Sequence, residues 1–335
     1  MAKTKLIDMD SIQSLINADV INQIVDKTFQ EFGRRRVKNP TKVTLDLGDN
    51  SDWPDYEGYM NAMPAYIEWL DVAGVKWVGG FEGKRKEANY PYITGMILMI
   101  DPQMGTFETI LDGTFITNMR TGAQTAVILK NLGFKRGQKI TVGLYGTGMQ
   151  AKTSLIALSE WYNIKEVKLS NHRYESVEPF IDEVEHLVDS SINYKEKPAD
   201  ASDADVVITA TKAEDPIIQS EWIKPGTILI PLGSNHEIDN KTIANADYIV
   251  VDHAGQAVHR GALSDAFSRD IIDQNDIDGT IGGLASGRIQ LGDLSDKTLI
   301  AVPIGMGAHD VAIAGVVAKR AQEQDIGKVF EFQPY

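Results

Sequence analysis

The 335-residue chain contains no cysteine, which excludes disulfide bonds, thiolate metal ligands and a cysteine nucleophile. This absence fits a cytoplasmic protein, which is the location that we expect. Long apolar runs are absent too: the longest are pieces such as TILIPLG and DYIVVDHA, far below the roughly 20 residues of a membrane-spanning helix. The opening stretch, MAKTKLIDMDSIQSLI, becomes acidic and amphipathic at once and shows no signal-peptide core. We therefore expect no membrane partner.

Positive charge is also scarce, since 33 basic residues stand against 47 acidic ones and the net charge is −14. Such a chain is unlike a nucleic-acid binder, which would carry basic stripes. The one basic cluster, GRRRVKNPTK at 33–42, follows an acidic amphipathic segment. A solvated helix end is therefore favoured over a nucleic-acid-binding patch. The length suits two domains, each with its own core.

The first part of the chain mixes helical and strand patterns. Apolar residues recur at helical spacing, which predicts two short helices over 10–33, a long helix in TFITNMRTGAQTAVILKNLG and an amphipathic helix in GMGAHDVAIAGVVAKRAQE. Apolar or alternating runs between Gly, Pro and Asn predict strands, with a hairpin return in GTFETILDG. The predicted strands lie at 42–48, 58–66, 72–81 and 91–101.

From Lys139 onward the pattern changes to short apolar runs rich in β-branched residues that alternate with helical segments. The runs include KITVGLYG, EVKLS, DVVITAT, TILIPLG and DYIVVD. Strands that alternate with helices at this interval predict a parallel sheet with helices on both faces.

A glycine loop, YGTGMQA, follows the first of these strands directly and opens the next helix. Gly146 permits a tight turn, and Gly148 lets the backbone approach a pyrophosphate at the helix N-terminus. Ala151, at the third position of the motif, still allows helix and strand to pack closely. Because the strand–turn–helix context is present on both sides, a dinucleotide site is favoured over a glycine turn that binds no nucleotide.

The end of the following strand bears on the choice of cofactor. An NAD-preferring site usually carries an acidic residue there, for the ribose 2′-hydroxyl. This chain has Asn171, His172 and Arg173 before the first acid, Glu175. These residues could receive a 2′-phosphate, so NADP is favoured over NAD, although Arg173 could instead be an ordinary surface residue.

Two cationic side chains stand in unusual contexts. Lys76 lies inside the apolar run VAGVKWVGG, and a buried ammonium costs several kcal/mol unless an anion meets it. The alternative is a lysine that reaches solvent from an edge strand. Arg120 precedes Thr121 where a helix is predicted to start, and its planar fork suits a carboxylate. Thr121 and the following amides could hold an anion, whereas a structural salt bridge is the alternative for Arg120.

With these features together, the chain resembles the ornithine cyclodeaminase/mu-crystallin family over nearly all of its length. The most specific signals are the lysine of GVKW, the DGT-x-IT-x-x-RTGA run and the glycine loop ending in QA. The other stretches that carry the resemblance are NPTKVTLDLG, YMNAMPAY, YPYITGMILMIDP, PGTILIPLGSN and GMGAHDVA.

The resemblance implies an α/β protein of two domains that forms a homodimer. A Rossmann-type doubly wound parallel sheet at 126–307 would be inserted in an α+β substrate-binding and dimerisation domain, residues 1–125 plus 308–335. Family members act on the Cα–N bond of amino acids with NAD(H) or NADP(H), and hold the substrate carboxylate with lysine and arginine side chains.

Lys76 and Arg120 match two of the carboxylate-binding positions. The third position, usually arginine, is Lys42 in this chain. Lysine keeps the positive charge but lacks the two-pronged guanidinium, so it should bind the substrate carboxylate less tightly. The candidate substrate-binding residues are Lys42, Met63, Lys76 and Arg120, and the candidate cofactor-binding residues are Thr121, Gly146, Thr147, Gly148, Met149, Gln150, Asn171, His172, Arg173, Thr211, Gly233 and Gly305.

One departure from the family concerns the reaction type. Cyclodeaminases carry an aspartate shortly after the glycine of LGSNHEID, where this chain has Asn235, followed by His236 and Glu237. Asparagine accepts no proton at neutral pH, so His236 or Glu237 supplies the acid/base function, or none is needed there. Ornithine cyclisation is therefore disfavoured. The candidate catalytic residues are Lys76, Arg120, Asn235 and His236.

We therefore expect hydride transfer between a nicotinamide cofactor and an amino acid or its imine, with the substrate carboxylate on Lys76 and Arg120. An ornithine cyclodeaminase and a non-catalytic ligand-binding protein of the mu-crystallin type are the alternatives. Lys76, close to a second cation, could also relay a proton. We expect the anion that meets Lys76 to come from outside, as substrate. His253 and His309 form no metal-binding spacing, so no catalytic metal is expected.

Overall fold

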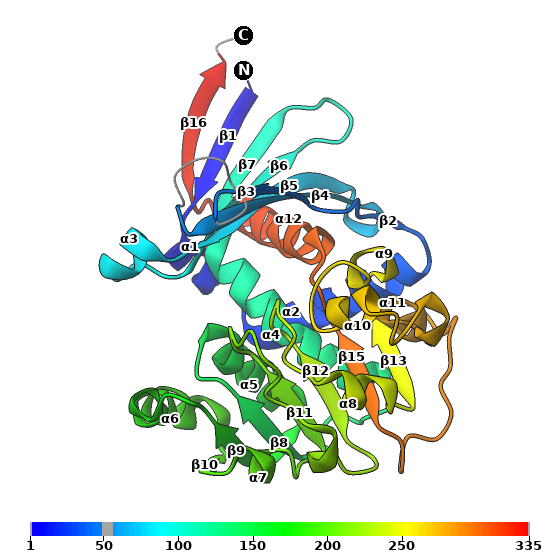
Figure 1. Cartoon of the computed structure of the whole chain (residues 1–335). Coiled ribbons are helices and arrows are strands. Elements are labelled where there is room, and N and C mark those ends of the chain that lie inside the picture. The colour runs from blue at the N-terminus through cyan, green and yellow to red at the C-terminus, as the bar shows by residue number, and fades with distance from the viewer. Residues whose placement is uncertain (1, 49–55, 334–335) are drawn as a thin grey trace. The chain divides into compact units, whose positions relative to one another are not determined.

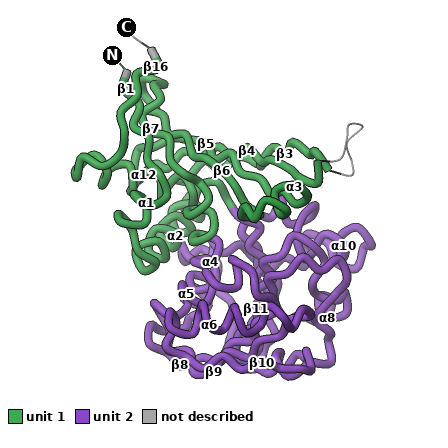
Figure 2. The backbone as a smooth tube through the Cα atoms, turned by 90° about the vertical axis from the view of Figure 1, so that its left-hand side faces the viewer, with its two compact units in different colours: residues 1–120, 306–335 green, residues 121–305 purple. Residues whose placement is uncertain are grey.

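The computed structural model describes residues 2–48 and 56–333 (Figure 1). The chain divides into two compact units, Met1–Arg120 with Met306–Tyr335 and Thr121–Gly305 (Figure 2). The sequence pattern placed the first boundary five residues later, at 125/126. The reason is that helix α4 (Thr114–Asn131) runs unbroken through the boundary, so no loop residue marks it. The helix start predicted at Thr121 is therefore wrong: Thr121 lies in the middle of α4, where it does not begin a helix and its backbone N–H is not at a helix N-terminus.

Unit 1 is built on an eight-stranded sheet whose main path runs β16-β1-β7-β6-β5-β4-β2, with β3 paired to β4. The pairs are antiparallel except β1 with β7. Helix α12 packs against β4, β5 and β6, and also contacts α2. The elements are β1 (Ala2–Ile7), α1 (Met9–Leu15), α2 (Ala18–Gly33), β2 (Val37–Lys38), β3 (Val43–Asp46), β4 (Gly58–Ile67), β5 (Val72–Phe81), α3 (Gly83–Glu87), β6 (Ile93–Ile100), β7 (Phe107–Asp112), α12 (Gly307–Glu323) and β16 (Lys328–Gln333).

The alternation along β5 separates two faces of this sheet. Lys76 points to the buried face, with Met63 of β4 and Ile97 of β6 directly beside it in the register. Trp77 points to the other face and is 52% exposed, next to Met96. A strand that alternates in this way buries one side-chain set and leaves the other outside, so the position of Lys76 in the sequence dictates its burial.

Two strands at the ends of the chain, β1 and β16, pair with each other, and Figure 1 shows both termini at this edge. The sequence pattern did not predict either strand. Both alternate apolar residues with Lys or Glu over only a few positions, AKTKLI and KVFEFQ, so their partner strands rather than their own composition stabilise them.

Unit 2 holds an eight-stranded parallel sheet in the order β10-β9-β8-β11-β12-β15-β13-β14, which confirms the parallel sheet predicted from Lys139 onward. Its strands are β8 (Lys139–Tyr145), β9 (Asn163–Ser170), β10 (Ser191–Tyr194), β11 (Val206–Thr209), β12 (Ile228–Pro231), β13 (Tyr248–Val251), β14 (Gly279–Thr280) and β15 (Leu299–Val302). Its helices besides α4 are α5 (Met149–Trp161), α6 (Val177–Val188), α7 (Pro198–Ala201), α8 (Asn240–Ala244), α9 (Ala254–Ala257), α10 (Ser264–Ser268) and α11 (Ile281–Ala285).

The order of these strands reverses between β8 and β11. The chain goes from β8 outward to β9 and β10, and then returns to the other side of β8 with β11. In open parallel sheets, ligands bind at the carboxyl ends of the strands at such a switch point. The glycine loop follows β8, and Thr211 lies just after β11.

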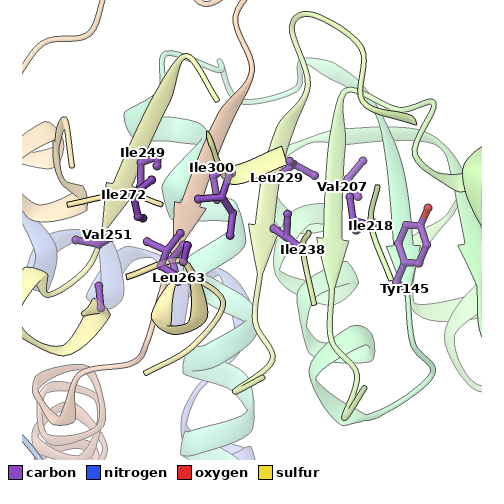
Figure 3. Packing of buried hydrophobic residues seen from close by; sticks show 14 of the residues in the cluster. Tyr145, Val207, Ile218, Leu229, Ile238, Ile249, Val251, Leu263, Ile272 and Ile300 are labelled. Carbon is purple, nitrogen blue, oxygen red and sulfur yellow. The ribbon is translucent and has the colours of Figure 1, made fainter. Parts of the chain in front are cut away.

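One face of this sheet carries a fully buried apolar core (Figure 3). Leu229 and Ile300 come from adjacent strands, and Ile238 and Leu263 from segments that cover the sheet. Burial of such side chains stabilises by about 1.5–3 kcal/mol each, so this core holds the strand ends of unit 2 in place.

Candidate functional site

Three charged side chains meet in the interior of unit 1. Lys76 and Asp310 are fully buried, and Arg120 is 7% exposed. Nζ of Lys76 lies 2.8 Å from Oδ2 of Asp310, and Nε of Arg120 donates a hydrogen bond of 3.3 Å to Oδ1. Thr117 donates its hydroxyl to the same oxygen at 3.4 Å. Two buried cations therefore share one carboxylate.

The N-terminus of α12 brings Asp310 to this position. Gly307 allows the helix to approach β4 closely, because a Cβ there would lie 2.6 Å from the carbonyl oxygen of Met63. Asn39 accepts the backbone N–H of Ala308 at 2.9 Å and so caps the same end. Asp310 stands in the first turn, where the positive end of the helix dipole stabilises a carboxylate.

Burial changes the protonation of this cluster. Burial, together with the charges of Arg120 and Lys42, lowers the pKa of Lys76 to about 7, while Asp310 opposes that shift. Burial alone would raise the pKa of Asp310, but the charges of Arg120 and Lys76 outweigh it and hold that pKa below its usual range. Asp310 is therefore an anion at neutral pH, and Lys76 titrates in the physiological range.

His309 is a further buried group beside these charges. Its ring lies edge-on to Phe29, with centroids 4.4 Å apart. Neither ring nitrogen has a hydrogen-bond partner within residues 2–48 and 56–333. Burial, and next the charge of Arg120, lowers the pKa of His309 to about 3. The imidazole is therefore neutral and adds no positive charge to the cluster.

The structure thus brings together Lys76, Arg120 and Met63 of the predicted substrate residues, and Lys42, half-buried, is close enough to lower the pKa of Lys76. The sequence reasoning missed Asp310. It expected the anion that meets Lys76 to come only from outside, whereas the chain itself supplies one. The available signal was the acidic residue in GMGAHDVA, at the start of an otherwise apolar helix.

In unit 2, the glycine loop has the geometry of a dinucleotide cradle. Gly146 has φ of +106°, and a Cβ there would lie 2.6 Å from the carbonyl oxygen of Ala210. Its N–H donates to the carbonyl of Ser170 at 3.0 Å, which joins the loop to the end of β9. Gly148 precedes α5 as its N-cap with extended backbone, and apart from its two chain neighbours no described residue has an atom within 4 Å of the Cβ it lacks. The N-terminus of α5 is therefore open to an anion.

The loop after β9 is tied to the glycine loop through Ser176. Thr147 and Asn171 both place a polar side-chain atom within hydrogen-bond distance of its hydroxyl, at 2.9 and 2.8 Å. Asn171 also donates to the carbonyl of Arg173 at 2.8 Å, so its amide shapes the loop. His172 and Arg173 are exposed, as are Gly148 and Met149, while Gln150 is half-buried.

Glu237, one of the sequence-based alternatives for the acid/base residue, is a second buried carboxylate. It is fully buried and accepts four hydrogen bonds, from the hydroxyl of Thr209, the N–H and hydroxyl of Thr211, and the N–H of Gly233, at 2.6–2.9 Å. Burial raises its pKa against these hydrogen bonds. Because its acceptors are all used, Glu237 joins the ends of β11 and β12 rather than serving as an acid/base.

Three further candidate residues near the carboxyl ends of these strands, Asn235, His236 and Gly305, each contact a nearby side chain or carbonyl group. Asn235 donates its amide to the carbonyl of Lys212 at 3.4 Å, and Nδ1 of His236 lies 3.7 Å from Asp265. The N–H of Gly305 donates to the buried Asp252 at 2.6 Å. With the hydrogen bonds of Glu237 all used, the prediction for the acid/base function at this position stays with His236 or with no residue at all.

Replacing Glu237 with glutamine should lower the free energy of unfolding by about 1–3 kcal/mol, because an amide NH₂ would face N–H and hydroxyl donors and leave them unpaired. Urea denaturation of the nucleotide-free protein measures this. Glu221→Gln is the matched control, since Glu221 pairs with Lys241 on the surface and its loss should leave the midpoint unchanged. Equal midpoints for the two variants would contradict the expected role.

The described residues include neither a helix that could span a membrane nor a cluster of metal-binding side chains. No helix there is both long and apolar enough to cross a membrane. Residues 2–48 and 56–333 contain no group of three or more His, Cys, Asp or Glu side chains that could hold a metal ion.

The sequence pattern of the ornithine cyclodeaminase/mu-crystallin family matches residues 3–325. The chain belongs to this family. It is 29% identical to the alanine dehydrogenase of Archaeoglobus fulgidus over 98% of this chain and 99% of that protein. The structure of an archaeal alanine dehydrogenase dimer with bound NAD, 28% identical, superposes with a TM-score of 0.89 over 99% of this chain and 100% of the other.

A more distant solved structure shares the fold. Δ1-pyrroline-2-carboxylate reductase of Thermococcus litoralis, solved with NADH and L-proline, is 24% identical and has a TM-score of 0.88 over 97% of this chain and 99% of the other. The family and the Rossmann-type α/β fold class predicted from the sequence are thus confirmed.

Proposed function

We propose that this protein is an NAD(P)-dependent oxidoreductase that transfers a hydride between the nicotinamide and the Cα of a small amino acid or its imine. The observation that carries the proposal is the buried pair of Lys76 and Arg120, which shares a single protein carboxylate. Buried charges need partners, and one substrate carboxylate would supply the missing negative charge. Unit 1 then holds the substrate, and the glycine loop of unit 2 holds the cofactor.

The residues present fit a dinucleotide. The space that a side chain at Gly148 would fill lies at the N-terminus of α5, where backbone N–H groups and the helix dipole favour a pyrophosphate. The ends of β11 and β12, joined by Glu237, place Thr211 and Gly233 at the switch-point edge of the same sheet. The cofactor, when bound, supplies the hydride chemistry.

The residues of unit 1 orient the substrate and move its proton. Arg120 offers a planar set of N–H donors that suits a carboxylate, and Lys76 adds a second cation. Because the pKa of Lys76 is about 7, it can exchange a proton with the substrate nitrogen at neutral pH. Positioning of this kind supplies a large part of the barrier reduction. Lys42 lies near enough to Lys76 to lower its pKa, but a lysine cannot make the two parallel hydrogen bonds that arginine makes to a carboxylate.

Reduction of an imine or oxidation of an amino acid is favoured over cyclodeamination. Asn235 cannot accept a proton. The carboxylate oxygens of Glu237 are already occupied by hydrogen bonds from Thr209, Thr211 and Gly233 at the ends of β11 and β12. Absorbance at the nicotinamide band distinguishes the reactions. Net oxidation of NADPH or NADH by Δ1-pyrroline-2-carboxylate, or net reduction of NAD(P)⁺ by L-alanine, is expected. Ammonia release from ornithine without net redox would overturn the proposal, and absence of any turnover would favour a binding protein.

The cofactor choice rests on Arg173. Its exposed side chain lies just past the end of β9 and would meet the 2′-phosphate of NADP. Arg173→Ala should raise the KM for NADPH by about tenfold, as loss of one charge-assisted contact does, and leave the KM for NADH unchanged. Arg136→Ala, which removes an exposed arginine elsewhere in unit 2, is the control. Equal changes for both cofactors would contradict the NADP preference.

The outward face of the unit 1 sheet is the proposed homodimer surface. Val43, Leu45, Trp77 and Met96 lie on this face and are each more than half exposed. A contiguous apolar patch of this kind marks a protein interface. The related archaeal alanine dehydrogenase is a dimer.

Light scattering should give twice the 36.9 kDa chain mass, and Trp77→Glu should shift the protein toward monomer. A monomeric wild-type chain would refute this surface.

A further inference from the structure

The buried cluster of unit 1 has more positive than negative charge, and one residue connects its members. Asp310 contacts Lys76 through Oδ2 and Arg120 through Oδ1. We propose that Asp310 is a positioning residue that orients Lys76 and Arg120 and balances all but one of their positive charges, so that the pair accepts a single substrate carboxylate. This inference rests on the proposed function for the identity of the ligand, but not for the contacts that carry it.

The contact with Arg120 determines which of its donors remain. Asp310 binds the Nε–H, on the side of the guanidinium, at 3.3 Å. Thr117, one turn earlier on α4 and on the same face of the helix, donates to the same carboxylate oxygen and so fixes it. A guanidinium has five N–H donors, and this arrangement leaves the two terminal nitrogens for a bidentate contact with another carboxylate.

The contact with Lys76 is a close, charge-assisted one. Nζ lies 2.8 Å from Oδ2, and the charge and hydrogen bonding of Asp310 both raise the pKa of Lys76. An ammonium has three donors. Asp310 therefore holds Lys76 in place through one donor and leaves the others for a ligand.

The neighbouring groups act on Lys76 in opposite directions. Arg120 from α4 and Lys42 from the segment before β3 lower its pKa, while Asp310 from α12 raises it. His309, also on α12, is neutral and adds no charge at physiological pH. Asp310 is thus the group that keeps Lys76 protonated near neutral pH. With Lys76 charged, the three groups sum to one positive charge, which one carboxylate neutralises.

The variant that tests this is Asp310→Asn, which keeps the shape and removes the charge. The pKa of Lys76 is measured by NMR on protein carrying ¹³Cε-lysine, with the resonance assigned by its loss in Lys76→Met. We expect titration near neutral pH in the wild type and a shift downward by about 1–3 units in Asp310→Asn, the usual effect of a close opposite charge. Asp325→Asn, a fully exposed change on the segment after α12, is the control and should leave the titration unchanged.

The same variants give an activity readout. For Δ1-pyrroline-2-carboxylate, the limb of the kcat/KM pH profile that belongs to Lys76 should move downward in Asp310→Asn by the same interval, and Asp310→Glu should restore most of it. If Asp310→Asn does not fold, Asp310→Glu decides, because its displaced carboxylate should leave a smaller downward shift of the same limb, and a profile identical to that of the wild type would overturn the inference. An unchanged Lys76 titration would overturn the inference even if the enzyme is active. An inactive wild type with a shifted titration would refute only the proposed function.

Discussion

Replacing Lys76 with methionine should lower kcat/KM for imine reduction by about a thousandfold, within the range for loss of a positioned proton-transfer group. Methionine fills a similar volume but supplies neither the charge for the substrate carboxylate nor the proton. Nucleotide affinity should not change, because Lys76 lies in unit 1 and the glycine loop in unit 2. Stopped-flow absorbance and fluorescence titration with NADPH measure the two effects.

This variant needs a stability control, because Asp310 would keep only Arg120 as a cationic partner. Breaking a buried ion pair commonly costs about 3–5 kcal/mol, so circular dichroism must show that the variant is folded at the assay temperature. Lys84→Met, on the exposed surface of α3, should retain full activity. Turnover of folded Lys76→Met at the wild-type rate would remove Lys76 from the mechanism.

Replacing Gly148 with aspartate should weaken NADPH binding by about a hundredfold, or 2.7 kcal/mol, without destabilising the protein. The residue is the N-cap of α5, has φ of −89° and has open space around the missing Cβ, so aspartate is a favourable cap there. Its carboxylate would occupy and repel the position of the pyrophosphate. Calorimetric titration and urea denaturation measure binding and stability separately.

Gly148→Asn is the matched control, because it caps the helix and fills the same space without the charge. It should lose less affinity than Gly148→Asp. Gly146 behaves differently: with φ of +106° and the Ala210 carbonyl close by, any side chain there should reduce stability as well as binding. Unchanged NADPH affinity in Gly148→Asp would exclude the glycine loop as the cofactor site.

Local patterns predicted the strands and helices that have a strong period or clear punctuation. The interval 72–81 was correct to the residue for β5, because an alternating run lies between a turn and Glu82. The parallel strands of unit 2 were visible as short β-branched runs. The terminal strands and the boundary within α4 were not visible, because the first depend on partner strands and the second has no loop.

The chemistry was predictable wherever a residue type is unusual for its position, as for Lys76 in an apolar strand. The sequence did not predict which of these residues contact one another in the folded chain. Arg120 and Asp310 are 190 residues apart in the sequence, and only the folding of unit 1 brings α4 and the start of α12 together. Glu237 likewise was a candidate acid/base residue in the sequence, and only the structure shows its hydrogen bonds to the ends of two parallel strands. The role of each predicted substrate and cofactor residue stays a prediction.

The division of unit 1 between the two ends of the chain has a consequence for protein synthesis. Unit 2 is one continuous stretch, Thr121–Gly305, and can fold as soon as it leaves the ribosome, since domains generally fold as units during translation. Unit 1 cannot, because its elements α12 and β16 follow unit 2 in the chain and are made after it. Until they arrive, the apolar face around Met63 and Ile97 has no helix over it, and Lys76 has no carboxylate. During synthesis Lys76 therefore lies on an uncovered face of the sheet, and its ion pair with Asp310 forms only after α12 has packed there.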